Sequence, residues 1–159
     1  MQLEQEVASI MMFALKAGGN PSPYYYDVPE QFKFPAMYFP QPEIITRGET
    51  FRTYASEYAW YINIMAETTE AAQEIGLEVL TQLKRARNLV PIVDEAGNLT
   101  GRKLRLKDPS LRKVDTGVVQ LTLEWTSRRP YDLAEAMLVM RFYLNYENNS
   151  NEEDALHGN

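Results

Sequence analysis

The chain has 159 residues, of which 45% are hydrophobic and 24% charged, the balance of a globular domain. Its net charge of −6 argues against tight binding to nucleic-acid phosphates, and its lack of cysteine excludes disulfides, thiol catalysis and cysteine-ligated metal sites. No apolar run approaches the ~20 residues that span a bilayer, and the start of the chain lacks the basic region of a secretory signal.

The first part of the chain predicts one helix and then an irregular segment. Residues 2–17 carry apolar side chains at three- and four-residue spacing, which predicts an amphipathic helix that Gly18 and Gly19 end. Residues 18–50 are rich in proline, so no long helix is expected there. We expect a Pro-rich loop with one short strand at 36–39.

A long strand and a long helix follow. Residues 51–66 alternate as a strand does, and residues 68–88 have helical apolar spacing. Thr68 or Thr69 is the expected cap, acidic residues occupy the first turns, basic residues occupy the last, and Pro91 is expected to end the helix. The strand places one set of large side chains on a single face: Tyr54, Tyr58, Trp60, Ile62 and Ile64.

The next elements read as strands. Residues 90–107 predict an extended hairpin around an Ala-Gly-Asn turn, closed by a second turn at 108–110. Residues 116–126 alternate cleanly between apolar and polar side chains, which predicts a strand with one buried face, terminated at 127–131. The apolar set of that strand is Val119, Leu121, Leu123 and Trp125.

The C-terminal part is ambiguous between helix and strand. Asp132 and Glu135 have the spacing of a capping box, whereas the later apolar residues alternate as in a strand. We expect a helical turn at 132–137, a strand up to residue 146, and a disordered acidic tail at 148–159. Together these elements predict a single α+β domain over residues 1–147, with a mainly antiparallel sheet and two helices packed on one face.

Charge is unevenly distributed along the chain. Residues 1–83 carry a charge of −7, residues 84–114 carry +6, and residues 115–159 carry −5. The basic block fits either a solvated face, a sheet edge protected by charge, or one half of a complementary contact between copies of the chain. A DNA-binding patch is disfavoured by the acidic residues around it.

Two groups of side chains are candidates for a subunit or partner interface. Three consecutive tyrosines lie between prolines and either pack against the core or form a contact surface, where tyrosine is enriched. Basic residues at the end of the helix and on the returning arm of the hairpin form the second group. The candidate residues are Tyr24, Tyr25, Tyr26, Arg85, Arg87, Arg102, Arg105 and Lys107.

No catalytic arrangement stands out. The one histidine, His157, lies near the C-terminal end of the sequence, and no phosphate-binding glycine motif is present. Glu57 and Glu124 lie on the polar sides of two strands and are weak candidates for an acid–base pair. We therefore expect a protein that is not an enzyme and that uses no cofactor and no metal. The glutamates Glu70, Glu74 and Glu78 share one helix face and are read as solvated, not as a cation site.

The order of elements resembles the tail terminator (tail completion) family of long-tailed bacteriophages and phage-like particles. The resemblance covers about residues 1–147 and rests on four stretches: the opening helix, FPAMYFPQPE followed by TYASEYAWYINIMA, the helix TTEAAQEIGLEVLTQLKRARN, and the strand TGVVQLTLEWTSRRPYD. The hairpin at 90–107 and the acidic tail have no counterpart in the family pattern.

The resemblance implies a structural virion protein in the tail or neck, assembled in the host cytoplasm. Members of the family form a ring, usually of six copies, that caps the tail tube, ends its polymerisation and offers a docking surface to the head connector. DNA passes through the hole without specific binding. Two other functions fit the sequence: another small neck or head-closure connector, and a small-molecule binding module whose pocket the aromatic residues would line.

Overall fold

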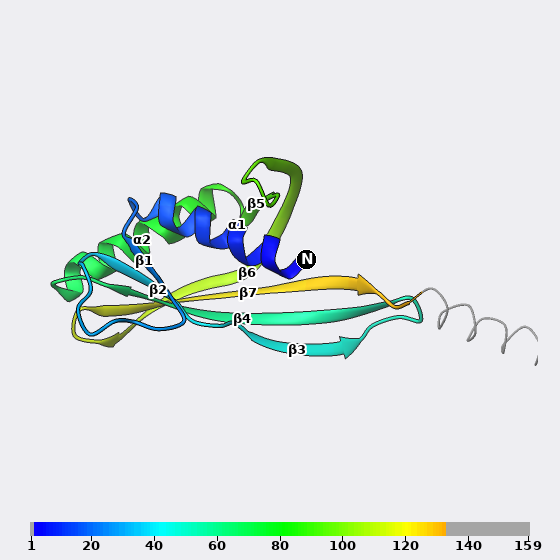
Figure 1. Ribbon diagram of the computed structural model, residues 1–159, viewed down its shortest axis with the longest axis horizontal. Coiled ribbons are helices and arrows are strands. Elements are labelled where there is room, and N and C mark those ends of the chain that lie inside the picture. The colour runs from blue at the N-terminus through cyan, green and yellow to red at the C-terminus, as the bar shows by residue number, and fades with distance from the viewer. Residues whose placement is uncertain (1, 133–159) are drawn as a thin grey trace, which may run out of the picture. The chain divides into compact units, whose positions relative to one another are not determined.

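The computed structural model describes residues 2–132, which group into two compact units (Figure 1). The first unit contains residues 2–44 and 57–126, and the second contains residues 45–56 and 127–132. The elements, in chain order, are α1 (Gln2–Ala17), β1 (Ser22–Tyr25), β2 (Ala36–Phe39), β3 (Glu43–Gly48), β4 (Thr53–Met65), α2 (Thr69–Arg85), β5 (Leu89–Val93), β6 (Leu99–Asp115) and β7 (Val118–Pro130).

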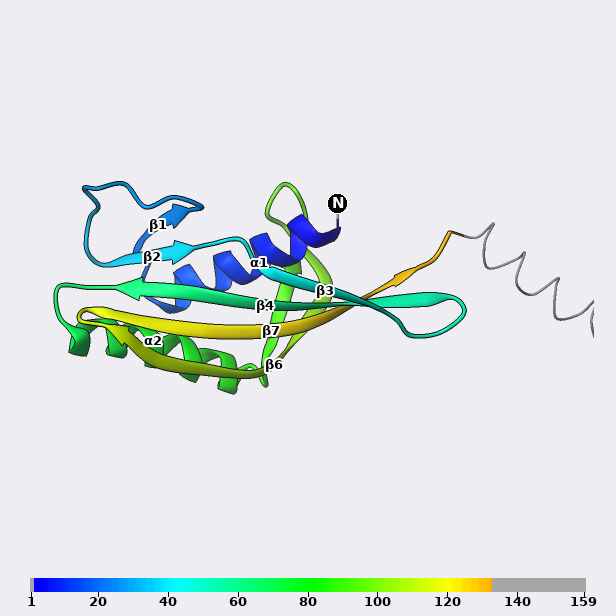
Figure 2. The ribbon, with the colours of Figure 1, turned by 90° about the horizontal axis from the view of Figure 1, so that it is seen from below.

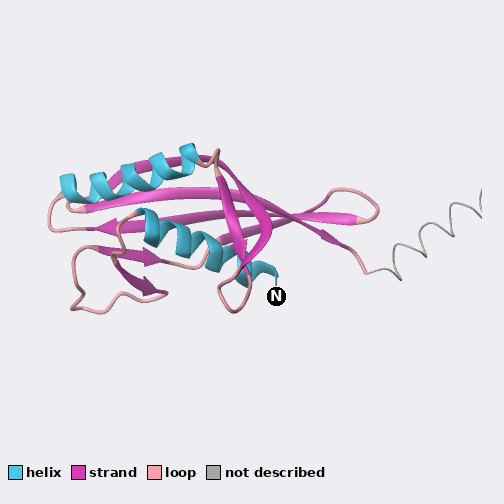
Figure 3. Cartoon of the chain, turned by 90° about the horizontal axis from the view of Figure 1, so that it is seen from above, coloured by secondary structure: helices cyan, strands magenta, loops and turns pink. Residues whose placement is uncertain are grey.

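The strands pair in the order β1-β2-β4-β7-β6-β5, and β3 pairs with β4 outside that path. β1 and β2 are parallel, whereas the pairs β2–β4, β5–β6 and β6–β7 are antiparallel. In the first unit both helices lie over the same face of the sheet (Figure 1, Figure 3), and Figure 2 shows the other face, with the strands in front of the helices. The predicted α+β class, with a mainly antiparallel sheet and two helices, is confirmed.

The core lies between the helices and the two central strands, β4 and β7. The alternation predicted for β7 is confirmed there, because its whole apolar set is buried, and that of β4 is confirmed for Tyr58, Trp60, Ile62 and Ile64. Tyr54, the fifth residue predicted on that face of β4, is only half-buried and belongs to the second unit. The rings of Tyr58 and Trp125 stack with centroids 4.8 Å apart. Trp60 donates from its indole nitrogen to the carbonyl oxygen of Pro40, at 2.6 Å. This hydrogen bond satisfies the polar atom of Trp60 inside the core.

Helix α2 begins where the sequence predicts and ends earlier than expected. The hydroxyl of Thr68 accepts a hydrogen bond from the backbone N–H of Ala71, at 3.1 Å, and so caps the first turn. Arg87 and Asn88 adopt left-handed φ angles of 56° and 57°, and their N–H groups bond to carbonyls of the last turn. The expectation that Pro91 ends the helix is therefore wrong, since it lies inside β5.

The Pro-rich segment at 18–50 contains more regular structure than expected. The predicted strand at 36–39 is confirmed as β2, but β1 and β3 flank it and were not predicted. β1 exists because it pairs in parallel with β2, a long-range partner that local periodicity does not reveal. β3 is exposed along its whole length, so it has no alternation between buried and exposed side chains to detect.

Two predicted strand ends are also wrong. The expected turn at 108–110 is absent, because β6 continues to Asp115 with a register shift against β7 between Lys107 and Ser110. A shift of this kind accommodates Pro109, which has no N–H to give to a regular ladder. β7 in turn runs to Pro130, whereas residues 127–131 were expected to terminate it.

The predictions for residues 133–147 and for the tail at 148–159 lie outside the described residues. Asp132 is the last residue described, so the expected domain end at residue 147 is not addressed. Neither described helix combines the length and apolarity that a transmembrane helix requires.

Candidate assembly interface

Exposed basic side chains lie along β6 and at the end of α2. All nine basic residues of segment 84–114 are exposed, and none is ion-paired with an acidic side chain in the described part of the chain. Their charges are therefore available to a partner. They are Lys84, Arg85, Arg87, Arg102, Lys103, Arg105, Lys107, Arg112 and Lys113.

Strand periodicity explains much of this exposure. Leu104 and Leu106 are buried in the core, so Arg105 and Lys107, which alternate with them, point the other way. Arg102 behaves differently: its guanidinium donates to the side-chain carbonyl of Gln5 on α1, at 3.3 Å. The structure thus separates three residues that the sequence groups on one arm.

An acidic surface lies on α2. Glu70, Glu74 and Glu78 are exposed at four-residue spacing, and Glu78 accepts a hydrogen bond from the amide of Gln82 at 2.9 Å. No cluster of three acidic or histidine side chains suited to a metal occurs among residues 2–132. The first unit therefore carries exposed basic side chains along β6 and an exposed acidic row along α2. Head-to-tail contacts between copies use two such different patches.

The three consecutive tyrosines, predicted either to pack against the core or to form a contact surface, differ in their surroundings. Tyr24 packs edge-on against Phe32, with centroids 6.1 Å apart, and Tyr25 stacks on Phe39 at 5.8 Å. Tyr26 is 63% exposed, with a left-handed φ of 63°, and its carbonyl accepts from the hydroxyl of Tyr38. Two of the rings hold the loop to the sheet, and only the third is mainly solvent-facing.

Prolines and hydrogen bonds occupy part of the N–H groups at the two ends of the sheet path, β1 and β5. In β1, Ser22 and Tyr26 give their N–H groups to carbonyls on the β2 side, and Pro23 between them has none. In β5, Pro91 has no N–H either, and the N–H of Val93 is taken by the hydroxyl of Ser9 on α1, at 3.0 Å. The outer edge of β5 therefore offers no N–H group of Leu89, Pro91 or Val93 to an added strand.

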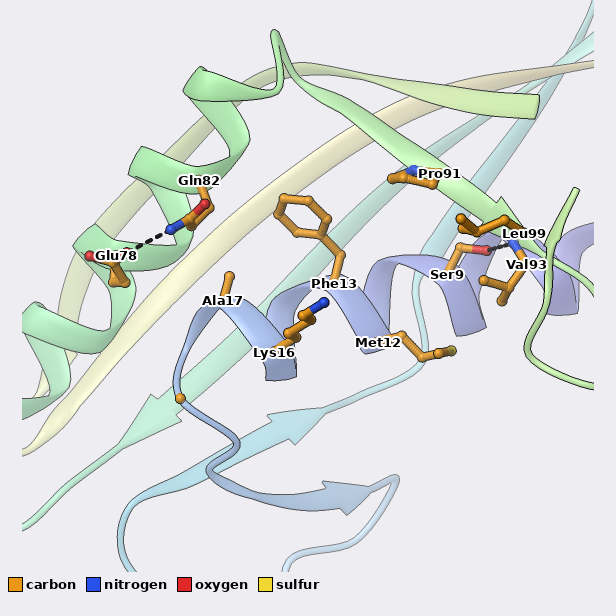
Figure 4. A pocket seen from close by; sticks show the side chains of 11 residues that line it. Ser9, Met12, Phe13, Lys16, Ala17, Glu78, Gln82, Pro91, Val93 and Leu99 are labelled. Atoms are coloured by element: carbon orange, nitrogen blue, oxygen red, sulfur yellow. Dashed lines mark hydrogen bonds between the residues drawn. The ribbon is translucent and has the colours of Figure 1, made fainter. Parts of the chain in front are cut away.

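A groove of about 610 Å³ opens between α1, α2 and the β5–β6 hairpin (Figure 4). Met12 and Phe13 line it from α1, and Glu78 and Gln82 line it from α2. The sequence analysis missed this site because its walls come from three distant segments. The available signal was the position of Met12 off the buried stripe of the first helix. The remaining lining residues are Ser9, Lys16, Ala17, Gly19, Pro91, Val93 and Leu99.

The second unit is held by polar and aromatic contacts of its own. The Nε of Arg128 lies 2.9 Å from both carboxylate oxygens of Glu49, so the two side chains form an ion pair within this unit. Tyr54 and Tyr131 pack with centroids 5.4 Å apart. Phe51, at the β3–β4 turn, is 70% exposed, so this unit also presents a large apolar side chain to solvent.

The weak candidates for acid–base chemistry are not brought into an enclosed site. Glu57 and Glu124 lie on neighbouring strands, β4 and β7, but Glu124 is exposed and neither lines the groove.

No family model matches the chain. Over 143 residues it is 24% identical to the phage-like element PBSX protein XkdJ of Bacillus subtilis (strain 168), covering 90% of this chain and 97% of that protein. It is 28% identical over 130 residues to the uncharacterized protein YqbJ of the same strain, covering 82% of this chain and 88% of that protein. Among solved structures it is similar to a chain of the virion of a native gene transfer agent particle, with a TM-score of 0.46 and 12% identity. The match covers 79% of this chain and 94% of that chain.

Proposed function

We propose that the protein is a structural component of a phage or phage-like particle, which forms a ring that caps the tail tube. The observation that carries this proposal is the similarity to a phage-like element protein along nearly the full length of both chains. The order of elements, which resembles the tail terminator family, points to the same role. In that role the ring ends polymerisation of the tube protein and offers its other side to the head connector.

The surfaces of the first unit support ring formation. A closed ring needs two different patches on each subunit, and the basic surface of β6 and the acidic surface of α2 form such a pair. The occupied outer edge of β5 disfavours the addition of a strand there, so contacts at β5 use side chains. Six copies are expected by analogy with the family.

The charge of the protein fits a ring through which DNA passes without being held. A net charge of −6 repels phosphates, which suits a hole that DNA passes through. We infer that the role is structural and not catalytic.

The test is assembly in the presence of tail tube protein. Native mass across a concentration series, with negative-stain images of the same sample, should show rings of about six copies with a central hole. Added to polymerising tube protein, the rings should shorten the tubes and mark one end. Tubes of unchanged length, with no bound protein at either end, would contradict the proposal. A neck or head-closure protein would instead bind the connector and leave the tube length unchanged.

The groove favours one alternative, a small-molecule binding module. Its volume and largely apolar walls are typical of ligand pockets. A ligand screen by thermal shift separates the two functions, because a bound ligand raises the melting temperature of the wild-type protein and not that of a groove variant such as Met12→Gln.

A further inference from the structure

The groove between α1, α2 and the β5–β6 hairpin is bordered by exposed apolar side chains. Met12 is 49% exposed and Leu99 is 74% exposed, and both border the groove together with Phe13 and Pro91 (Figure 4). Apolar side chains that converge on one concavity are typical of a surface that another chain covers. The walls are helices and a hairpin of the compact first unit, so the shape is preformed.

Charged side chains of opposite sign flank the apolar walls. Lys16 comes from the last turn of α1, and Glu78 comes from the middle of α2. Lys16 is exposed and makes no ion pair within the described part of the chain. An occupant that carries one acidic and one basic residue on an otherwise apolar segment therefore fits the groove best.

The chain itself contains such a segment, at residues 133–147. Its sequence, LAEAMLVMRFYLNYE, is apolar at 11 of 15 positions, and its only charges before the last residue are Glu135 and Arg141. It follows Asp132, which belongs to the second unit, whereas the groove belongs to the first. Burial of so apolar a segment against an apolar surface is favourable.

We propose that segment 133–147 of one subunit docks in the groove of the neighbouring subunit. The inference rests on the proposed ring, and it supplies the two different patches that a head-to-tail contact needs: an apolar segment and an apolar groove. Burial of Met12 and Leu99 provides the free energy of association, and Glu135 and Arg141 meet the opposite charges of the rim. The charged surfaces of α2 and β6 then orient the subunits.

Site-specific cross-linking tests this contact in the full-length protein, which has no cysteine of its own. Met12→Cys is labelled with a benzophenone maleimide, and Leu77→Cys is the matched control. Both positions lie on helices and both are 49% exposed, but Leu77 is not part of the groove. Equal amounts of ¹⁴N and ¹⁵N protein are mixed, irradiated and digested with trypsin.

We expect mixed-isotope cross-links from position 12 to peptides of segment 133–147, at least tenfold more abundant than those from position 77. Rings that form without such cross-links, or cross-links only within one chain, would overturn this inference and leave the ring itself standing. A protein that forms no ring, alone or on tail tubes, would overturn both proposals.

A second pair of variants measures the energetic contribution of the groove. Met12→Gln should raise the concentration at which rings dissociate by fivefold or more, because it places a polar group in the apolar contact. Leu77→Gln should change that concentration by less than twofold. Equal effects of the two variants, with unchanged melting temperatures, would argue against the groove as the contact.

Discussion

The indole nitrogen of Trp125 lies 3.0 Å from a carboxylate oxygen of Glu6, to which it donates a hydrogen bond. Glu6 belongs to α1 and Trp125 to β7, 119 positions apart, and the two side chains are 3% and 0% exposed. The contact therefore fixes the first helix on the sheet through a polar bond inside the core. Because α1 forms one wall of the groove, this bond also positions the groove.

Removal of the carboxylate should destabilise the fold. Glu6→Leu leaves the buried N–H of Trp125 without an acceptor, which typically costs about 1–3 kcal/mol of unfolding free energy. Glu6→Gln keeps a hydrogen-bond acceptor on a side chain of the same length, so its free energy of unfolding should fall less. Urea denaturation followed by tryptophan fluorescence gives both values, and Glu70→Gln on the exposed face of α2 is the control. Equal losses of unfolding free energy in the Leu and Gln variants would show that the hydrogen bond from the Trp125 N–H does not stabilise the fold.

Gly117 should be intolerant of any side chain. Its φ is +72°, and a Cβ there would lie 2.7 Å from the carbonyl oxygen of Ala66, whose N–H bonds to Gly117 in turn. Gly117→Ala therefore combines left-handed strain, about 1–2 kcal/mol, with a backbone clash. Gly97→Ala is the matched control, because Gly97 has a φ of +83° and nothing within 4 Å of a Cβ.

Thermal or urea unfolding should show a clearly larger loss for Gly117→Ala than for Gly97→Ala. The difference between the two variants isolates the contact with Ala66, since the strain of a positive φ is common to both. Similar losses of stability in the two variants would mean that the backbone around Ala66 shifts to relieve the clash at little cost.

Charge reversal on β6 should impair assembly without unfolding the subunit. Arg102→Glu combined with Arg105→Glu removes attraction to an acidic surface of the neighbour, so rings should dissociate at lower salt than those of the wild type. Native mass and circular dichroism report assembly and folding separately. Adding Glu70→Lys and Glu74→Lys to the same chain should restore rings if α2 is the facing surface. Normal rings from the reversed variant alone would exclude Arg102 and Arg105 from the contact.

The β5–β6 turn should weaken in acid. The backbone N–H of Asn98 donates to a carboxylate oxygen of Asp94 at 2.8 Å and is the main cause that holds the pKa of that carboxyl below its usual range. A lowered pKa in the folded state means that the ionised form stabilises the turn at neutral pH. That stability is lost as the pH falls from the usual range of an aspartate through the lower folded pKa.

NMR titration of the Asp94 carboxyl measures this pKa directly. Asp94→Asn keeps a neutral acceptor, so its stability should depend less on pH than that of the wild type in the acid range. The stability difference between the two proteins should shrink as the pH falls. A titration at the ordinary aspartate pKa would show that the N–H groups do not favour the charged form.

Much of the first unit follows from local sequence. Strict alternation places the large side chains of β4 and β7 on one face, and the Thr68 cap with its charge distribution marks α2, because these signals depend only on neighbours along the chain. The exposure of the basic residues on β6 likewise follows from their alternation with Leu104 and Leu106. Periodicity and capping are short-range effects, so the sequence alone determines them.

The tertiary structure decides the features that depend on partners far apart in the chain. β1 forms only by pairing with β2, β6 continues past Pro109 because β7 holds it, and Arg102 turns to Gln5 across 97 positions. The groove exists only where α1, α2 and β5 meet. No local pattern encodes these contacts, because their free energy comes from surfaces that become neighbours only when the chain has folded.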